Sequence, residues 1–215
     1  MLQVDGSYRK LEMSNMFGTK SKEGLDRKLK RYGVSFTVTG RGERTIYHIQ
    51  HFADPFKIYA ITELGCDANT DFRKLRNFYY YFFNDEDFRN LPDEMKEQRM
   101  RGEGKDVSRQ TIKKYENRLV QMEYIAYLGG QDCVYYFAYK ERRREATHEE
   151  YRKAWQEYWQ DKAHMSSQQA IRLMVFHYDG IAKKQPRPTL NGIYGREIDY
   201  MLSLITESIE NEIED

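Results

Sequence analysis

The sequence is poor in residues that crosslink a chain or anchor it in a membrane. It contains two cysteines, Cys66 and Cys133, and neither lies in a metal-binding or redox motif. Two isolated thiols exclude a fold built on disulfides and favour a reducing compartment, so we expect a cytoplasmic protein. The sequence has no run of about 18 apolar residues and no charged-then-apolar leader at its start. We therefore expect neither a membrane span nor a secretion signal.

Sequence motifs of enzymes are also missing. There is no Walker loop, no dinucleotide-binding glycine pattern and no G-x-S-x-G motif. His48 and His51 would face opposite sides of a strand, and no cysteine or carboxylate cluster joins them to make a zinc site. The run Tyr79–Tyr81 could hold a nucleophile for DNA nicking, but the His-apolar-His motif of such enzymes is absent, so we interpret it as aromatic core. We expect no enzyme, no metal site and no cofactor.

A strong net charge is absent from the whole chain but not from its parts. Residues 1–144 carry 27 basic and 21 acidic side chains, whereas residues 145–215 carry 8 and 13. The net charges are therefore +6 for residues 1–144 and −5 for residues 145–215. This difference favours a polyphosphate partner for the first range, and a protein partner or solvent for the second. The hydrophobic content of 40% is sufficient for packed cores, so we do not expect a disordered chain.

What the sequence does contain is one pattern that occurs twice, with an offset of ninety residues. Each copy is a short amphipathic helix, with Ser21 or Ser108 as its predicted N-cap, followed by a predicted β-hairpin with a glycine turn. The first copy has a helix ending near Tyr32, a strand over 34–38, a turn at 40–42 and a return strand over 44–49. The second has a helix over 109–123, a strand over 124–128, a turn at Gly129–Gly130 and a strand over 134–139. Such self-similarity is typical of repeated structural units.

The pattern predicts an α+β fold that is mainly helical, with three parts. Residues 1–66 form a first unit and its connector, and residues 67–144 form a second unit of helices and a hairpin. Residues 145–215 are predicted to be a C-terminal helical region, with helix starts at the capping boxes Thr147–Glu150 and Ser166–Gln169. Pro186, Pro188 and Asn191–Gly192 are interpreted as a loop.

Cationic and amide side chains occupy the outer face of both repeated helices. They are the residue types that contact base edges and phosphates, and in the helix 109–123 they fall in the first turns. The candidate nucleic-acid-binding residues of this second helix are Arg109, Gln110, Lys113, Lys114 and Asn117. Those of the first unit are Lys20, Lys22, Arg27 and Lys28, together with Arg41 and Arg44 at the hairpin tip.

These residues resemble the winged helix-turn-helix superfamily. The stretch Val107–Tyr115, followed by Leu119 and by Met122–Ile125, is similar to a recognition helix and the entry to its wing. Two such units in tandem are similar in layout to plasmid and phage replication initiators. The resemblance implies two winged-helix units that read double-stranded DNA, in a regulator or a replication initiator of a phage, plasmid or other mobile element.

An alternative use of the same fold is a protein-interaction module. In that case the winged helices are scaffolds of an inhibitor or adaptor that captures a protein or a nucleoprotein complex. The C-terminal helices carry an aromatic face with Tyr151, Trp155, Tyr158 and Trp159. We expect this face to pack on the rest of the chain and to form a homodimer, with a different protein partner as the alternative.

Overall fold

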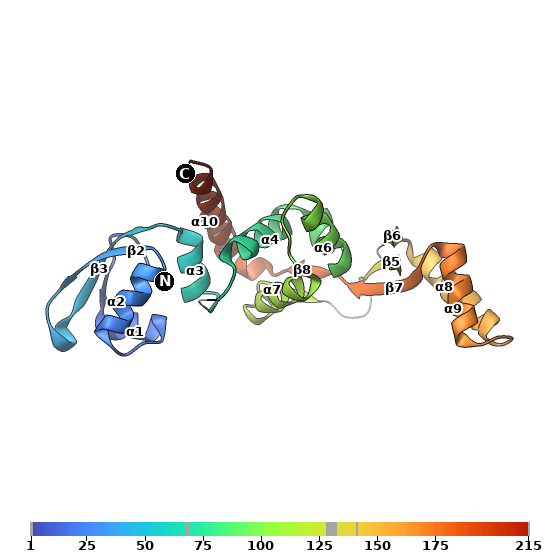
Figure 1. Ribbon diagram of the computed structural model, residues 1–215, viewed down its shortest axis with the longest axis horizontal. Helices are drawn as coiled ribbons and strands as arrows, with labels where there is room; N and C mark the ends of the chain where they lie inside the picture. Colours follow the sequence, from blue (N-terminus) through green and yellow to red (C-terminus); the bar gives the residue numbers. More distant parts are fainter. Residues whose placement is uncertain (1, 68, 128–132, 141, 215) are drawn as a thin grey trace. The chain divides into compact units, whose positions relative to one another are not determined.

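The computed structural model describes residues 2–67, 69–127, 133–140 and 142–214 (Figure 1). Helices make up 58% of the chain and strands 20%, in small separate sheets, which confirms the predicted α+β class with mainly helical content. Among the described residues, no helix is long and apolar enough to cross a membrane. The chain packs as two units: unit 1 extends to Tyr80 and resumes at Gly192, and unit 2 comprises Tyr81–Asn191.

Unit 1 combines a small sheet with helices from both ends of the sequence. Its elements are β1 (Ser7–Arg9), α1 (Lys10–Phe17), α2 (Lys22–Arg31), β2 (Val34–Thr39), the 3-10 turn η1 (Gly42–Arg44), β3 (Ile46–Phe52), α3 (Pro55–Thr62), the larger part of α4 (Phe72–Asn84), η2 (Gly192–Tyr194) and α10 (Gly195–Glu214). The helix α2 begins where the Ser21 hydroxyl accepts a hydrogen bond from the Gly24 N–H at 3.0 Å, as the sequence predicts.

The hairpin predicted after α2 is present. The strands β2 and β3 pair antiparallel, and β1 pairs with the other edge of β3, so the sheet order is β1-β3-β2. The return strand begins at Ile46 rather than at Arg44, because Gly42–Arg44 form a 3-10 turn at the tip. The sheet and helices bury one apolar core that includes Met13, Leu25, Leu29, Tyr47 and Ile49.

The predicted connector after the first hairpin contains a helix, α3. Asp54 caps it by accepting a hydrogen bond from the Lys57 N–H at 2.9 Å, and Pro55 occupies its first turn. The Asp54 carboxylate also accepts a hydrogen bond of 2.7 Å from the Ser208 hydroxyl of α10. Arg76 of α4 donates to the Ser208 carbonyl at 2.8 Å, so polar contacts fix α10 in this unit.

Unit 2 is continuous in sequence. It contains the end of α4, α5 (Glu86–Asn90), α6 (Asp93–Gly102), α7 (Arg109–Gln121), β4 (Ile125–Tyr127), β5 (Cys133–Tyr139), β6 (Arg142–Ala146), α8 (His148–Lys162), α9 (Ser167–Tyr178), β7 (Ile181–Pro186) and β8 (Pro188–Leu190). The predicted cap of α7 is present, since Ser108 accepts from the Thr111 N–H at 3.3 Å. Both predicted capping boxes are present at the starts of α8 and α9.

The second predicted hairpin is wrong. The strand β4 pairs with β8, about 60 residues later in the sequence, while β5 pairs with β6 and β7. β4 and β5 therefore follow one another along the segment 181–190 instead of pairing with each other. The predicted turn residues Gly129–Gly130 lie outside the described residues. A glycine pair is a local signal, whereas the partner that covers a strand edge is decided by tertiary packing.

The prediction that residues 145–215 form one helical region is also wrong in part. This stretch includes β7 and β8, and only its last helix, α10, belongs to unit 1. Pro186 and Pro188 suggested a loop, but proline is compatible with strand ends and edge strands, and β7 is an edge of the sheet β6-β5-β7. The domain boundaries expected after residues 66 and 144 stay a prediction.

The aromatic face of α8 mostly covers its own unit. Tyr158 and Ala154 are buried with Phe137 of β5 and Met174 of α9, and Tyr151 and Trp155 pack against this core. Trp159 remains 59% exposed. The intramolecular packing is therefore observed, whereas the homodimer through the C-terminal helices stays a prediction.

Candidate nucleic-acid interface

The helix α7 has a buried apolar face and an exposed polar face, with Glu116 and Val120 as exceptions. Ile112, Tyr115 and Leu119 are buried in unit 2. The five predicted contact residues of this helix are all exposed: Arg109, Gln110, Lys113, Lys114 and Asn117. The five side chains predicted from the sequence to lie on the outer face of this helix are therefore exposed to solvent.

The one acidic residue of α7, Glu116, is withdrawn into the core. Its carboxylate accepts hydrogen bonds from the buried Lys96 ammonium of α6 and from the Tyr127 hydroxyl of β4. Burial raises the pKa of Glu116, although Lys96 acts in the opposite direction. Burial and the Glu116 carboxylate raise the pKa of Tyr127. As a result, the exposed face of α7 carries cationic and amide groups without a carboxylate.

A carboxylate of α6 holds the start of α7. One oxygen of Glu94 lies 2.7 Å from the Arg109 guanidinium and 3.5 Å from the Lys183 ammonium. Its other oxygen accepts from Arg143 Nε of β6 at 2.7 Å. Burial opposes ionisation, but Lys183 and Arg143 outweigh it and lower the pKa of Glu94. Arg109 is therefore oriented by a side chain that the sequence analysis did not identify.

The candidate residues of unit 1 differ from one another in exposure and contacts, whereas those of α7 are all exposed. Lys20 precedes α2 and is exposed, as are Lys22 and Arg27 on the helix. Lys22 lies 3.8 Å from the Asp26 carboxylate. Lys28 is only half-exposed, because its ammonium donates to the Phe17 carbonyl at 2.6 Å. This contact ties α2 to α1, so Lys28 has a structural role that the sequence did not reveal.

The hairpin tip of unit 1 is a tight turn with exposed arginines. Arg41, which precedes η1, and Arg44, the last residue of η1, are both exposed. Gly40 has φ of +76°, and a Cβ added there would stand 2.2 Å from the Arg44 carbonyl oxygen. Only glycine fits this position, so the turn chemistry predicted from the sequence is a steric requirement.

His48, considered in the sequence as half of a metal-binding pair, lies in the middle strand of the unit 1 sheet. Its two ring nitrogens lie 2.8 Å from the Ser7 hydroxyl of β1 and 2.8 Å from the Thr39 hydroxyl of β2. The imidazole thus bridges the three strands by hydrogen bonds. Among the described residues, no group of three potential metal ligands gathers anywhere.

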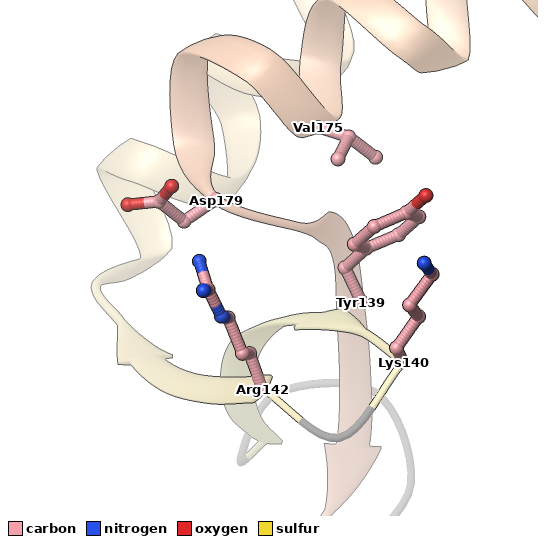
Figure 2. A pocket seen from close by; sticks show the side chains of 5 residues that line it. All are labelled: Tyr139, Lys140, Arg142, Val175 and Asp179. Atoms are coloured by element: carbon pink, nitrogen blue, oxygen red, sulfur yellow. The ribbon is translucent and has the colours of Figure 1, made fainter.

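Unit 2 has a second basic feature at the turn between β5 and β6. A cavity of about 570 Å³ lies beside this turn, lined by Tyr139, Lys140, Arg142, Val175 and Asp179 (Figure 2). The three consecutive arginines of β6 and Lys183 of β7 were not among the predicted contacts. The run Arg142–Arg144 is visible in the sequence, and it lies at the expected boundary after residue 144.

Comparison of the chain with protein-family models, with curated proteins and with solved structures finds no match.

Proposed function

We propose that this chain binds double-stranded DNA, with α7 as the element that reads base edges in unit 2. The observation that carries the proposal is the composition of the exposed face of α7. Arg, Lys, Gln and Asn side chains project from its first turns, and the single acidic residue of the helix is buried. These side chains are the usual donors to guanine, adenine and phosphate in the major groove.

Unit 1 supports the same proposal through its topology. Two helices are followed by an antiparallel hairpin whose tip carries exposed arginines, and a third strand extends the sheet. A winged helix has a further helix before its hairpin, so unit 1 shares with that fold a cationic helix followed directly by a hairpin, and these two elements contact DNA in the proposal. In this proposal α2 contacts DNA through Lys20, Lys22 and Arg27. The hairpin tip contacts the DNA backbone or a minor groove through Arg41 and Arg44.

The biological role that fits two DNA-binding units is a regulator or a replication initiator of a phage, plasmid or other mobile element. This assignment rests on the resemblance in layout alone. A duplex site selected in vitro from random sequences would reveal whether the DNA carries two half-sites, one for each unit.

The direct test is the salt dependence of DNA binding. We expect the full chain to bind duplex DNA with a steep negative slope of log K against log salt. Replacing Lys113 and Lys114 together by Ala should reduce this slope by roughly two, because each phosphate contact contributes about 0.9. Fluorescence anisotropy with a labelled duplex measures both quantities.

The matched control for this test is a pair of lysines on α8, Lys153 and Lys162, both exposed. Their replacement by Ala removes the same net charge from unit 2 away from α7. Equal slopes for the two double variants would contradict a reading role for α7 and leave only general electrostatic attraction. A full chain without any duplex affinity would remove the proposal altogether.

A second candidate function is a protein-interaction module. The observation in its favour is the exposure of large aromatic side chains, with Phe176 on α9 79% exposed and Trp159 on α8 59% exposed. This function predicts a stable complex with a protein partner that survives high salt. Replacement of Phe176 and Trp159 by Ser should abolish such a complex without a change in DNA affinity.

A further inference from the structure

The edge strand β6 begins with three consecutive arginines that have different surroundings. In the sheet order β6-β5-β7, one side of β6 is unpaired within the sheet. Arg142 is opposite Tyr139 of β5, and Arg144 is opposite Phe137. Arg142 and Arg144 thus lie on one face of the strand, and Arg143 lies on the other.

Two of the three arginines already have partners inside unit 2. The Arg143 guanidinium binds Glu94 and donates to the carbonyls of Lys140 and of Arg142, the latter at 2.7 Å. It therefore joins β6 to α6 and to the residue that follows β5. Arg144 pairs with Glu150 at 2.8 Å and stacks on the Phe137 ring at 4.8 Å.

Arg142 is exposed, as Arg144 is, but its guanidinium makes no ion pair or hydrogen bond with another described residue. It lines the cavity of about 570 Å³ beside Lys140, and also a second cavity of about 390 Å³ with Gln98, Arg143 and Arg144. Asp179 borders both cavities, across from the Arg142 guanidinium (Figure 2), without an ion pair between them. The donors of the Arg142 guanidinium are therefore available at the start of an edge strand.

We propose that Arg142, with Lys140 beside it, binds a phosphate group of the DNA backbone. A guanidinium donates two parallel hydrogen bonds to phosphate oxygens, and the adjacent ammonium adds charge. Glu94 binds Arg109 of α7 with one oxygen and Arg143 of β6 with the other, so β6 is joined to the start of α7 through the face of the strand that carries Arg143. Arg142 lies on the opposite face of the strand. This inference rests on the proposed reading of DNA by α7 and adds a backbone contact in unit 2 outside the base pairs that α7 reads.

The first arm of the test measures DNA binding at several salt concentrations. Arg142→Gln should lower the slope of log K against log salt by about 0.9, equally for selected and random duplexes, because a phosphate contact carries no sequence information. Arg142→Lys retains the charge and should retain the slope. The matched control is Arg172→Gln on the exposed face of α9, for which no change is expected.

The second arm uses inorganic pyrophosphate without DNA. Thermal unfolding, followed by tryptophan fluorescence, should shift to higher temperature in pyrophosphate relative to sodium chloride of equal ionic strength. The shift should persist in Arg172→Gln and disappear in Arg142→Gln, since a ligand stabilises only the folded state that binds it.

The two arms separate the failure of this inference from the failure of the proposed function. DNA binding with an unchanged slope in Arg142→Gln overturns the backbone contact and leaves the reading by α7 intact. No DNA binding, together with a pyrophosphate shift that depends on Arg142, overturns the proposed function and assigns the site to free phosphate compounds. The absence of both effects overturns both proposals.

Discussion

In each unit a cationic helix is followed by a short strand, and the two strands differ in the partner with which they pair. In unit 1, β2 pairs with β3, the next strand of the chain. In unit 2, β4 pairs with β8, which arrives after α8 and α9. A hairpin is a local structure that its own turn can register, whereas a strand closed by a distant segment depends on the packing of the whole unit.

The two cationic helices, α2 and α7, also differ in the exposure of their acidic side chains. On α2, Glu23 is exposed and Asp26 is half-exposed, where it accepts a hydrogen bond from the Tyr47 hydroxyl at 2.8 Å. On α7, Glu116 is buried against Lys96. The exposed surface of α7 is therefore more uniformly cationic than that of α2, at the cost of a buried ion pair in unit 2.

The largest expected effect comes from breaking that buried pair. Lys96→Ala leaves Glu116 in the core without its cation, and we expect a loss of about 3–5 kcal/mol in the free energy of unfolding. Urea unfolding followed by tryptophan fluorescence measures it in unit 2, because the two tryptophans of the chain, Trp155 and Trp159, both lie on α8.

Two further variants test the explanation for the Lys96 effect. The double replacement Lys96→Met with Glu116→Leu removes both charges and should recover most of the lost stability. A loss below about 1 kcal/mol for Lys96→Ala would contradict the assignment of a buried, mutually dependent pair, because even an exposed ion pair can contribute that much.

A smaller effect is expected at the hairpin turn of unit 1. Gly40→Ala forces a Cβ against the Arg44 carbonyl at positive φ, so we expect a loss of about 2–4 kcal/mol from strain and overlap. Gly42→Ala is the matched control, because Gly42 also has positive φ, of +63°, but no atom within 4 Å of the added Cβ. Hydrogen exchange of the β2 and β3 amides measures both, and equal losses would show that overlap is unimportant.

Glu94→Gln should weaken the cluster that joins α7, β6 and β7. We expect a loss of about 1.5–3 kcal/mol at neutral pH, the usual contribution of hydrogen bonds to charged groups. Because the pKa of Glu94 is lowered in the folded protein, its contribution is present above the ordinary carboxyl pKa and is lost as pH falls through the lowered value. The variant should therefore lose less stability on acidification than the natural sequence.

The pH profile of Glu94→Gln is measured by tryptophan fluorescence in urea at several pH values. The comparison is with Glu157→Gln on α8, a carboxylate that accepts a hydrogen bond from Tyr178 of α9. Parallel stability curves for Glu94→Gln and the natural sequence between pH 7 and about pH 3 would show that Glu94 is not favoured in its charged form.

The smallest effects concern the caps of the two helices. Ser108→Ala at α7 and Ser21→Ala at α2 each remove one hydrogen bond to a helix N–H. We expect a loss of about 1 kcal/mol for each. The Ser21 bond is shorter, 3.0 Å against 3.3 Å, so its loss should be the larger of the two. Circular dichroism melting curves of the two variants, recorded side by side, would contradict this ranking if Ser108→Ala melted first.

The helices could be predicted because their signals are local. Ser21, Ser108, Thr147 and Ser166 mark starts that the structure has at those positions. The exposed face of α7 followed from the spacing of Ile112, Tyr115 and Leu119. The winged-helix interpretation itself and the DNA-binding role of these side chains stay predictions.

The strands of unit 2 could not be predicted, because their partners are far away in sequence. Nothing in the residues of β4 identifies β8 as its neighbour, and Pro186 and Pro188 suggested a loop. The same limit applies to Glu94, whose three cationic partners come from α7, β6 and β7. A carboxylate in the first turn of a helix is common, so its sequence position gives no sign of that role.

The attachment of α10 to unit 1 has a consequence for the order in which the chain folds during synthesis. Unit 2 is a continuous segment inserted between Tyr80 and Gly192, so all of it is synthesised before α10. The hydrogen bonds of Asp54 and Arg76 with Ser208 can therefore form only after the whole of unit 2 has been synthesised. The synthesis of unit 1 thus begins before that of unit 2 and ends after it. If a ribosome stalls within unit 2, the nascent chain exposes the first part of unit 1 with its α10-binding surface uncovered.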